Sequence, residues 1–274
     1  MIPSRPMRHP FFDVPVPTVI GHRGASGELP ENTLAAFERA VVQGAVILET
    51  DVHVTRDGAL VLFHDDTLER TTDGTGRVAD HTLKELQRLD AGYRFAPEAG
   101  FPERGKGHRI PLLEEALRAF PEVRFNIEVK ERIPALIEGT VELVRRLGRE
   151  DTVLLAAAHD DTMADLRAHL AATGVRPAVG ASAGDVLQCV RAALEGRPPP
   201  PGPMALQVPP DFGGRPVVTR PLVEYAHAHG LVVHVWTINE PEEMERLLDL
   251  GVDGVMSDFP GRLADVVARR AARG

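Results

Sequence analysis

The stretch VPTVIGHRGASGELPENTLAAFERAVVQGAVILETDVHV, residues 16–54, contains a strand, a helix and a second strand in succession. Apolar runs predict the strands at Val16–His22 and Ile47–Val54, and apolar residues at helical spacing predict a helix over Thr33–Gln43. Two strands separated by a helix are typical of a parallel sheet that is covered by helices. We therefore expect the same organisation further along the chain.

The predicted helix has a start signal, an apolar stripe and a stop signal. Asn32 or Thr33 can accept a hydrogen bond from the first turn, and Gly44 can end the helix. Side chains three or four residues apart lie on one face of a helix. The buried stripe is therefore predicted at Leu34, Phe37 and Val41.

The alternation of apolar runs and amphipathic segments continues to the end of the chain. Further strands are predicted at Leu60–His64, Phe125–Val129, Val153–Ala157, Pro177–Val179, Met204–Val208, Val232–Trp236 and Gly254–Ser257. Further helices are predicted at Ile133–Leu147, Thr162–Ala172, Gly184–Glu195, Pro221–His229 and Pro241–Leu250. About eight strand–helix units predict an α/β fold of the (β/α)8 TIM barrel type.

One segment, residues 66–110, does not follow this rhythm. It is rich in glycine and has few apolar residues with which to form a core of its own. We interpret it as a small loop-rich insertion at the active-site mouth of the barrel, where the strand carboxyl ends and the loops after them lie. A single barrel domain over residues 1–274 is predicted, and an independent second domain is the lesser alternative.

Composition and charge narrow the class of protein. The 274 residues are 43% apolar, and the net charge of -9 comes from acidic residues spread along the chain. Binding of nucleic acid by an extended basic face is therefore not expected. No apolar run is long enough to span a bilayer, and the proline-broken N-terminus lacks the apolar centre of a secretory signal. We expect a cytoplasmic protein, and its oligomeric state is left open.

One cysteine and one proline-rich run carry no predicted chemistry. Cys189 cannot form an internal disulfide and lies in an apolar helical stretch, so a buried structural thiol is expected. Residues 197–203, RPPPPGP, cannot continue a helix and predict a stiff surface connector.

Acidic side chains are placed on the predicted strands so that they share a face. Glu49 and Asp51 are two residues apart on one strand, and side chains at that spacing point to the same side. Two buried like charges are costly unless a cation or a basic side chain offsets them. With Glu128 they offer hard carboxylate oxygens that suit one divalent cation, Mg²⁺ or Ca²⁺. Each acid taken alone is as well explained as an ion-pair partner or a surface residue.

Two histidines each end an apolar run, and imidazole exchanges protons near neutral pH. They are His22 and His64, the latter followed by Asp65. We predict that one takes a proton from the attacking oxygen while the other gives one to the leaving alkoxide. A lone histidine at such a position is more often structural. His53 is a further candidate, because its two-residue spacing aligns it with Asp51.

Two cations and one aromatic residue complete the predicted site. Arg23 offers a planar fork for phosphate oxygens, and Lys130 supplies a compact positive charge on the same face as Glu128. Either cation can instead be a salt-bridge partner of the nearby acids. Trp236 ends a predicted strand, where it can form a wall of the pocket as well as pack in the core.

In their order along the chain, these pieces resemble the glycerophosphodiester phosphodiesterase family. The matching segments are GHRGASGELPENTLAAFERAVVQGA, ETDVHVTRDGALVLFHDDTLERTTDGTGRV, RIPLLEEAL, NIEVK, VHVWTINE and GVDGVMSDFP. They extend across most of the chain, from Val19 to Pro260. A series of this length is far more specific than any single motif.

The resemblance implies a TIM barrel enzyme that hydrolyses a small-molecule glycerophosphodiester to glycerol 3-phosphate and an alcohol. It implies a divalent cation held by Glu49, Asp51 and Glu128, catalytic roles for His22 and His64, and substrate contacts from Arg23, Lys130 and Trp236. One departure is the pair Ala157-Ala158, where the family frequently has serine and phenylalanine. The substrate contacts expected from that strand are therefore in doubt.

Two other functions are alternatives to this one. A lysophospholipase D-like enzyme would use the same phosphate machinery with an apolar lip, for which Phe95 and Phe101 alone are too few. A non-catalytic phosphodiester-binding barrel is argued against by the presence of both histidines and all three carboxylates. Attack by a neighbouring glycerol hydroxyl, through a cyclic phosphate, and direct attack by water both stay open.

Overall fold

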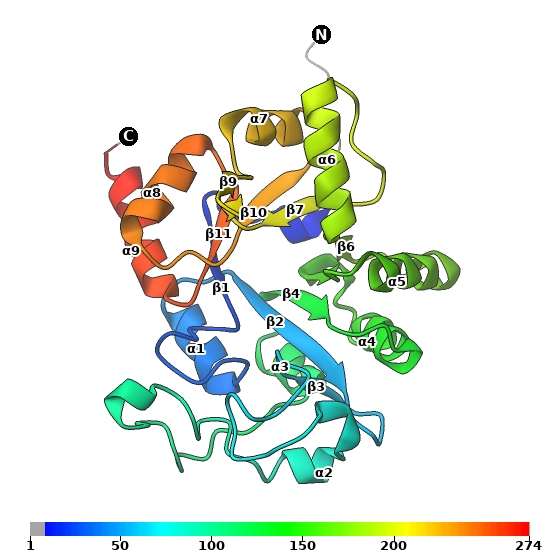
Figure 1. Cartoon of the computed structure of the whole chain (residues 1–274), viewed down its shortest axis with the longest axis vertical. Coiled ribbons are helices and arrows are strands. Elements are labelled where there is room, and N and C mark those ends of the chain that lie inside the picture. Colours follow the sequence, from blue (N-terminus) through cyan, green and yellow to red (C-terminus); the bar gives the residue numbers. More distant parts are fainter. Residues whose placement is uncertain (1–8, 274) are drawn as a thin grey trace.

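The computed structural model describes residues 9–273, and eight of its strands form a ring that is nearly closed (Figure 1). The ring strands are β1 (Thr18–Gly21), β2 (Ile47–Val54), β4 (Arg124–Val129), β5 (Val153–Ala156), β6 (Ala178–Val179), β7 (Ala205–Val208), β10 (Val232–Val235) and β11 (Gly254–Ser257). Residues 1–8 and Gly274 lie outside the described residues. The predictions that cover them, a single domain over residues 1–274 and the absence of a secretory signal, are not tested there.

The ring has the connectivity of a parallel barrel. Its strands follow the order β6, β5, β4, β2, β1, β11, β10, β7, and every neighbouring pair is parallel. The two ends of this path meet, because Gly180 forms an isolated parallel bridge with Ala205 and the Met204 amide donates to the Val179 carbonyl at 2.8 Å. The predicted (β/α)8 barrel is confirmed.

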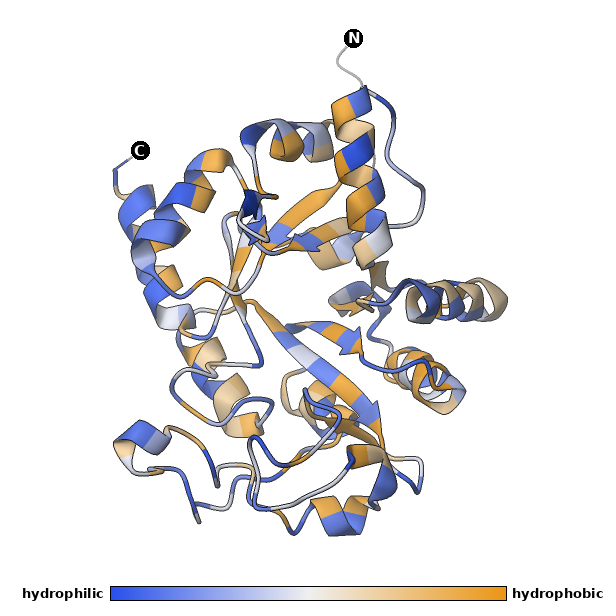
Figure 2. Ribbon diagram, in the orientation of Figure 1, coloured by the Kyte–Doolittle hydropathy of each residue, from blue (hydrophilic) through white to orange (hydrophobic). Residues whose placement is uncertain are grey.

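Helices cover the outside of the ring (Figure 1). They are α1 (Leu34–Val42), α3 (Leu113–Ala119), α4 (Pro134–Arg146), α5 (Asp160–Thr173), α6 (Ala183–Glu195), α7 (Arg220–Ala228), α8 (Pro241–Leu250) and α9 (Pro260–Ala271). All of the predicted helices are present, whereas α3 and α9 are additional. Figure 2 shows β2 and β4 alternating between hydrophobic and hydrophilic residues, so these two strands carry polar groups on one face.

Helix α1 begins where predicted, but its buried face differs from the predicted stripe. The Thr33 side chain accepts a hydrogen bond from the Ala36 amide at 3.2 Å. The fully buried positions are Ala36, Phe37 and Ala40. Leu34 is 37% exposed and Val41 only partly buried. A Cβ on Gly24 would lie 2.8 Å from the Ala36 Cβ, so small residues allow the loop after β1 to pack directly on the helix.

The strand predicted at Leu60–His64 is present but lies outside the ring. It forms β3 (Leu60–Leu62), which pairs antiparallel with β2. The chain therefore turns back along β2 and does not cross over through a helix at this point. The Phe63 amide donates to the Asp51 carbonyl at 3.1 Å, which places the following residue, His64, beside the C-terminal part of β2.

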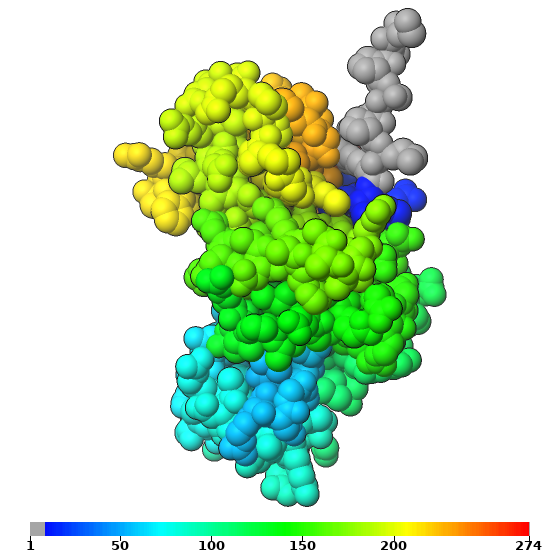
Figure 3. Space-filling model, turned by 90° about the vertical axis from the view of Figure 1, so that its right-hand side faces the viewer, coloured from blue at the N-terminus to red at the C-terminus, as the bar shows by residue number. Residues whose placement is uncertain are grey.

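Residues 66–110 form a loop-rich segment next to β3. They contain the short helix α2 (Leu83–Leu86) and 3-10 turns at Val78–Asp80 and Pro97–Ala99. Their buried apolar side chains pack with β3 and its flanks in one cluster of Val61, Phe63, Leu68, Val78, Leu86, Ala91 and Ile110. The cyan part of the chain, which includes the first half of this segment, forms the lower end of the molecule in Figure 3.

The N-terminal end of the ring is closed by two aromatic residues. A 3-10 turn at Pro10–Phe12 buries Phe11 and Phe12. They pack against inner residues near the starts of the strands, Ile20, Ile47, Leu154, Ala178, Ala205 and Val232. Arg124 on β4 donates from Nη2 to the Asp13 carbonyl at 2.8 Å and holds the turn in place. The interior of the ring is therefore filled at this end.

The structure also bears on the predictions for Cys189, the proline-rich run and a membrane span. Cys189 is fully buried in α6, as predicted, and burial raises the pKa of its thiol to about 11. The proline-rich run at 197–203 contains no helix or strand. Within residues 9–273, none of the helices combines the length and the apolar character that crossing a bilayer requires. The cytoplasmic location stays a prediction.

Candidate active site

Eight of the predicted site residues line one cavity at the C-terminal end of the ring, with a volume of about 280 Å³, whereas the further candidate His53 does not. They are His22, Arg23, Glu49, Asp51, His64, Glu128, Lys130 and Trp236. The other lining residues are Asn126, Ala156, Ala157, Ala158, Ala181, Gln207 and Met256. In a parallel barrel this end carries the loops that differ between enzymes, so it is the expected place for a site.

The three carboxylates come together because β2 and β4 are neighbours in register. Asp51 lies opposite Glu128, and Glu49 precedes Asp51 by two residues on the same face. Ligand atoms of these three carboxylates all lie within 4.8 Å of one another. Glu49 and Asp51 are 6% and 1% exposed, so their charges are almost entirely removed from water.

The electrostatics of this cluster favour a further positive charge. Burial and the nearby Asp51 raise the pKa of Glu49 to about 7. Burial also opposes ionisation of Asp51, but Lys130 and Arg23 hold the pKa of Asp51 below its usual value. One of the two acids therefore retains affinity for a proton near neutral pH. A cluster of hard oxygen donors that is short of positive charge fits a divalent cation such as Mg²⁺ or Ca²⁺.

The two basic residues contact the same carboxylates. Lys130 Nζ lies 3.4 Å from Asp51 Oδ1 and 3.3 Å from Glu128 Oε1. Arg23 Nε lies 3.4 Å from Asp51 Oδ2, and the Arg23 amide donates to Glu49 Oε2 at 3.0 Å. Arg23 adopts the left-handed conformation, with φ of 53°, which turns its amide toward β2. Both cations are thus held at the edge of the carboxylate cluster.

His22 is fixed by a carboxylate that directly follows the last strand of the ring. Its Nδ1 donates to Asp258 Oδ1 at 2.7 Å, which leaves Nε2 as the nitrogen 3.9 Å from Glu49 Oε2. Asp258 also accepts hydrogen bonds from Ser26 Oγ and Asn239 Nδ2, each at 2.7 Å. Burial lowers the pKa of His22, but Asp258 and Glu49 outweigh it and the net shift is upward.

His64 has a similar arrangement on the opposite flank. Its Nδ1 donates to Asp65 Oδ1 at 2.6 Å. Burial opposes ionisation of Asp65, but hydrogen bonds from Arg70 and His64 lower the pKa of Asp65 to about 2. The His64 side chain is 30% exposed, compared with 16% for His22. Each histidine therefore has its Nδ1 bonded to an aspartate, and His22 Nε2 also lies 3.4 Å from Thr237 Oγ1.

The remaining wall of the cavity is neutral. Trp236 follows β10 and is 41% exposed, so it lines the opening and is not a core residue. Ala158, from the pair that departs from the family pattern, is exposed to the cavity, whereas Ala157 is almost fully buried. The strand β5 thus contributes little more than methyl groups to the lining.

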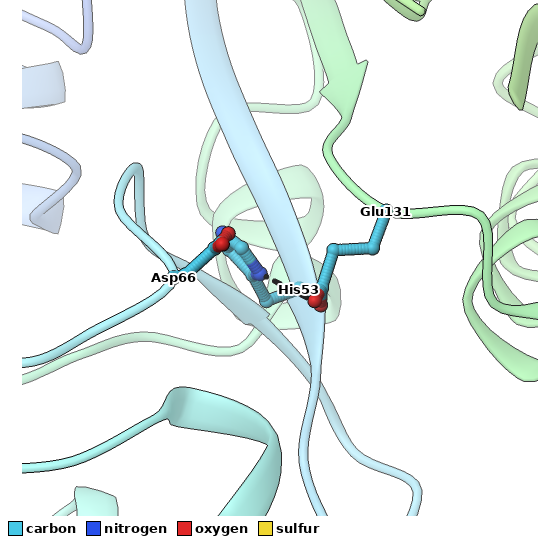
Figure 4. A group of neighbouring side chains, drawn as sticks. All are labelled: His53, Asp66 and Glu131. Carbon is cyan, nitrogen blue, oxygen red and sulfur yellow. Dashed lines mark hydrogen bonds and ion pairs between the residues drawn. The ribbon is translucent and has the colours of Figure 1, made fainter.

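A second group of ligand-type side chains, His53, Asp66 and Glu131, lies outside the cavity lining (Figure 4). His53 Nδ1 faces Glu131 Oε2 at 3.2 Å, and its Nε2 faces the His64 carbonyl at 3.3 Å. Arg77 Nη2 donates to Glu131 Oε1 at 3.0 Å. The expected alignment with Asp51 therefore does not bring His53 into the cavity. Its ring instead links the segments after β3 and β4.

Sequence reasoning missed three charged residues beside the cavity. Asp258 follows β11 directly, and the rule that singles out residues at strand carboxyl ends would have found it. Glu31 and Arg70 lie in two separate loops, and their spacing gives no sign that they meet. The only signal was that both fall within segments of the family resemblance.

Comparisons with known proteins agree with this geometry. A sequence model described as the glycerophosphoryl diester phosphodiesterase family matches residues 22–262. A glycerophosphodiester phosphodiesterase of Caldanaerobacter subterraneus subsp. tengcongensis is 34% identical over 259 residues, covering 92% of this chain and 98% of that protein. A human lysophospholipase D is 32% identical over 269 residues, covering 90% of this chain and 84% of that protein.

Solved structures give the same result. An Oleispira antarctica phosphodiesterase, in complex with the product sn-glycerol-3-phosphate, has a TM-score of 0.74 and 30% sequence identity. The similarity covers 92% of this chain and 97% of that one. Every residue predicted for the site, from His22 to Trp236, falls within the region matched by the family model.

Proposed function

Because the chain belongs to the glycerophosphoryl diester phosphodiesterase family, we propose that the cavity at the mouth of its barrel is where the diester is hydrolysed. The chain is a phosphoric diester hydrolase that releases glycerol 3-phosphate from glycerophosphodiesters. One observation carries the assignment of the site: three carboxylates, two histidines held by aspartates and two basic side chains border a single space.

Glu49, Asp51 and Glu128 are the proposed ligands of one divalent cation. Their oxygens converge, and the raised pKa of Glu49 indicates that the cluster lacks positive charge. A bound Mg²⁺ or Ca²⁺ would polarise phosphoryl oxygens and offset charge that develops on them. The donor set does not favour one of these two ions over the other.

Arg23 and Lys130 are proposed to bind the phosphate together with that cation. The planar guanidinium of Arg23 can contact two phosphate oxygens, and the Lys130 ammonium can contact one. Both side chains already touch Asp51, so each is held at a fixed distance from the carboxylates. A negatively charged diester would therefore enter a space with positive groups along one rim.

His22 and His64 are proposed to share the proton transfers. With Nδ1 bonded to an aspartate, each ring is fixed in orientation and presents Nε2. One ring would accept the proton of the attacking hydroxyl or water, and the other would protonate the leaving alkoxide. The aspartates would stabilise each ring when it carries a positive charge.

The proposal is tested with a panel of diesters assayed after chelation and after return of Mg²⁺ or Ca²⁺. Glycerophosphocholine and lysophosphatidylcholine are compared at equal concentration, with release of choline as the measurement. We expect cation-dependent release and a preference for the deacylated substrate. A strong preference for lysophosphatidylcholine would replace this substrate class by lipid phosphodiesters, and activity that survives chelation would contradict the cation site.

A further inference from the structure

Arg70, in the loop-rich segment 66–110, connects two carboxylates beside the cavity. Its Nη1 and Nη2 donate to the two oxygens of Glu31, each at 2.7 Å. Its Nη2 also donates to Asp65 Oδ1 at 3.1 Å, and its Nε donates to Asp65 Oδ2. A single guanidinium thus holds both carboxylates through paired hydrogen bonds, the geometry in which arginine–carboxylate pairs are strongest and most directional.

Each of these carboxylates holds a residue of the proposed site. Asp65 Oδ1 accepts the hydrogen bond from His64 Nδ1, and Glu31 Oε1 accepts one from Arg23 Nη1 at 3.1 Å. The contacts therefore run without a break from the Arg23 guanidinium to the His64 ring. Glu31 lies in the loop after β1, whereas Asp65 lies after β3, so Arg70 ties together two segments that are separate in the fold.

His64 needs this support more than His22 does. Asp258, the partner of His22, is held by Ser26 and Asn239, which belong to the loops of the ring. Asp65 instead follows a three-residue strand that is outside the ring. Within residues 9–273, Arg70 is the side chain besides His64 whose hydrogen bonds reach the Asp65 carboxylate.

We propose that Arg70 is a positioning residue for diester hydrolysis: through Asp65 it fixes the His64 ring, and through Glu31 it fixes that ring relative to the Arg23 guanidinium. Arg70 does not line the cavity but a neighbouring pocket, together with Ser26 and Glu31, so we place its effect on hydrolysis at the His64 ring. This inference rests on the proposed proton-transfer role of His64. Without the paired hydrogen bonds of Arg70, Asp65 would no longer be fixed, and the His64 imidazole could turn about its side-chain bonds.

The test is a double-mutant cycle with Arg70→Gln and His64→Ala, assayed on glycerophosphocholine with the cation present. Arg70→Gln alone is expected to lower kcat by about 10- to 100-fold, because a misplaced proton-transfer group has an effect of that size. KM should change by less than about threefold, since Arg23 keeps its contacts with Asp51 and Glu49 when Arg70 is replaced. In the His64→Ala background, Arg70→Gln should lower kcat by less than about twofold.

Two further variants separate positioning from folding. Arg70→Lys keeps the charge but cannot hold both carboxylates through paired hydrogen bonds, so it should restore only part of kcat. Arg56→Gln is the matched control, because Arg56 is 59% exposed and pairs with Glu85 away from the cavity. It should leave kcat and KM unchanged. Circular dichroism and thermal unfolding verify that each variant is folded, and Arg70→Lys replaces Arg70→Gln in the cycle if the latter does not fold.

The outcomes are distinguishable. An equal loss from Arg70→Gln in both backgrounds, or a loss confined to KM, would overturn the positioning role while leaving His64 in place. Unchanged kcat in Arg70→Gln would overturn it as well. If His64→Ala alone retains full turnover, the proton-transfer assignment itself is wrong, and the proposal for Arg70 fails with it.

Discussion

The cavity has two halves that differ in chemical character. The charged half comes from β1 to β4 and their loops and contains His22, Arg23, Glu49, Asp51, His64, Glu128 and Lys130. The neutral half comes from the remaining strands and contains Ala156, Ala157, Ala158, Ala181, Gln207, Trp236 and Met256. In the charged half each charged side chain has a partner of opposite sign nearby, whereas the neutral half is lined mainly by small or uncharged side chains. We therefore expect the charged half to determine the reaction and the neutral half to affect the choice of alcohol.

The strongest test of the charged half removes the cation. Chelation, or Asp51→Asn, is expected to lower kcat on the order of 10⁴-fold, because a cation held by the proposed ligands would supply several kcal/mol to the transition state. Cation dependence of glycerophosphocholine hydrolysis is the measurement. Glu131→Gln is the matched control, since its carboxylate belongs to the group outside the cavity. If Glu131→Gln abolished cation-dependent hydrolysis and Asp51→Asn did not, the cation would belong to the other group.

The next largest effect is expected from the histidines. His22→Ala and His64→Ala should each lower kcat about 10³-fold, because general acid–base groups contribute in that range. His229→Ala is the control, as this residue is exposed on the far end of α7. Steady-state kinetics with folded variants decide the question. A variant of either cavity histidine with wild-type turnover would break the division between the halves.

A smaller effect tests the neutral half. Ala158→Phe places a large ring in the cavity at an exposed position, where no core packing is disturbed. We expect kcat/KM for glycerophosphocholine to fall about tenfold relative to glycerophosphoethanolamine, since crowding by a few methyl-sized groups is worth that much. Ala268→Phe, on the exposed side of α9, should leave the ratio unchanged. Equal losses on both substrates would show that the neutral half does not select the alcohol.

The last prediction concerns stability and not turnover. Burial lowers the pKa of His234, on β10, from 6.5 to about 4. The unfolded chain then binds a proton at higher pH than the fold does, so the stabilisation is complete above about pH 6.5 and is lost as pH falls toward 4. The loss should reach about 3 kcal/mol, measured by urea unfolding across this range. His234→Asn should flatten the slope, and His229→Asn should not; a slope unchanged in His234→Asn would remove the buried ring as its source.

The same contrast explains what the sequence could predict. Glu49, Asp51 and Glu128 could be found because a strand has a two-residue period, and chemistry placed on strands is therefore readable from spacing. Asp258 could also have been predicted, because it follows a strand directly and strand carboxyl ends carry the site of a parallel barrel. The neutral half was largely invisible, because alanines at strand ends carry no chemical signal of their own.

Other features depend on contacts between distant segments, which spacing does not encode. From the sequence, the antiparallel strand β3 could not be distinguished from a strand of the ring, because both appear as a short apolar run. The prediction that Leu34 belongs to the buried face of α1 was wrong. The loop after β1 packs closely on the helix at Ala36 and Ala40, and this contact depends on tertiary packing that the sequence spacing does not show. The contact between Glu31 and Arg70 likewise exists only once the loop-rich segment has folded.

Phe11 and Phe12 give the barrel one further property. Within residues 9–273 they fill the base of the ring, so we expect the diester to enter and the products to leave through the opening that Trp236 lines. The departing alcohol and the phosphorylated glycerol share that exit. The anionic product, attracted to the basic rim, should depart second and compete with fresh diester for the vacated place.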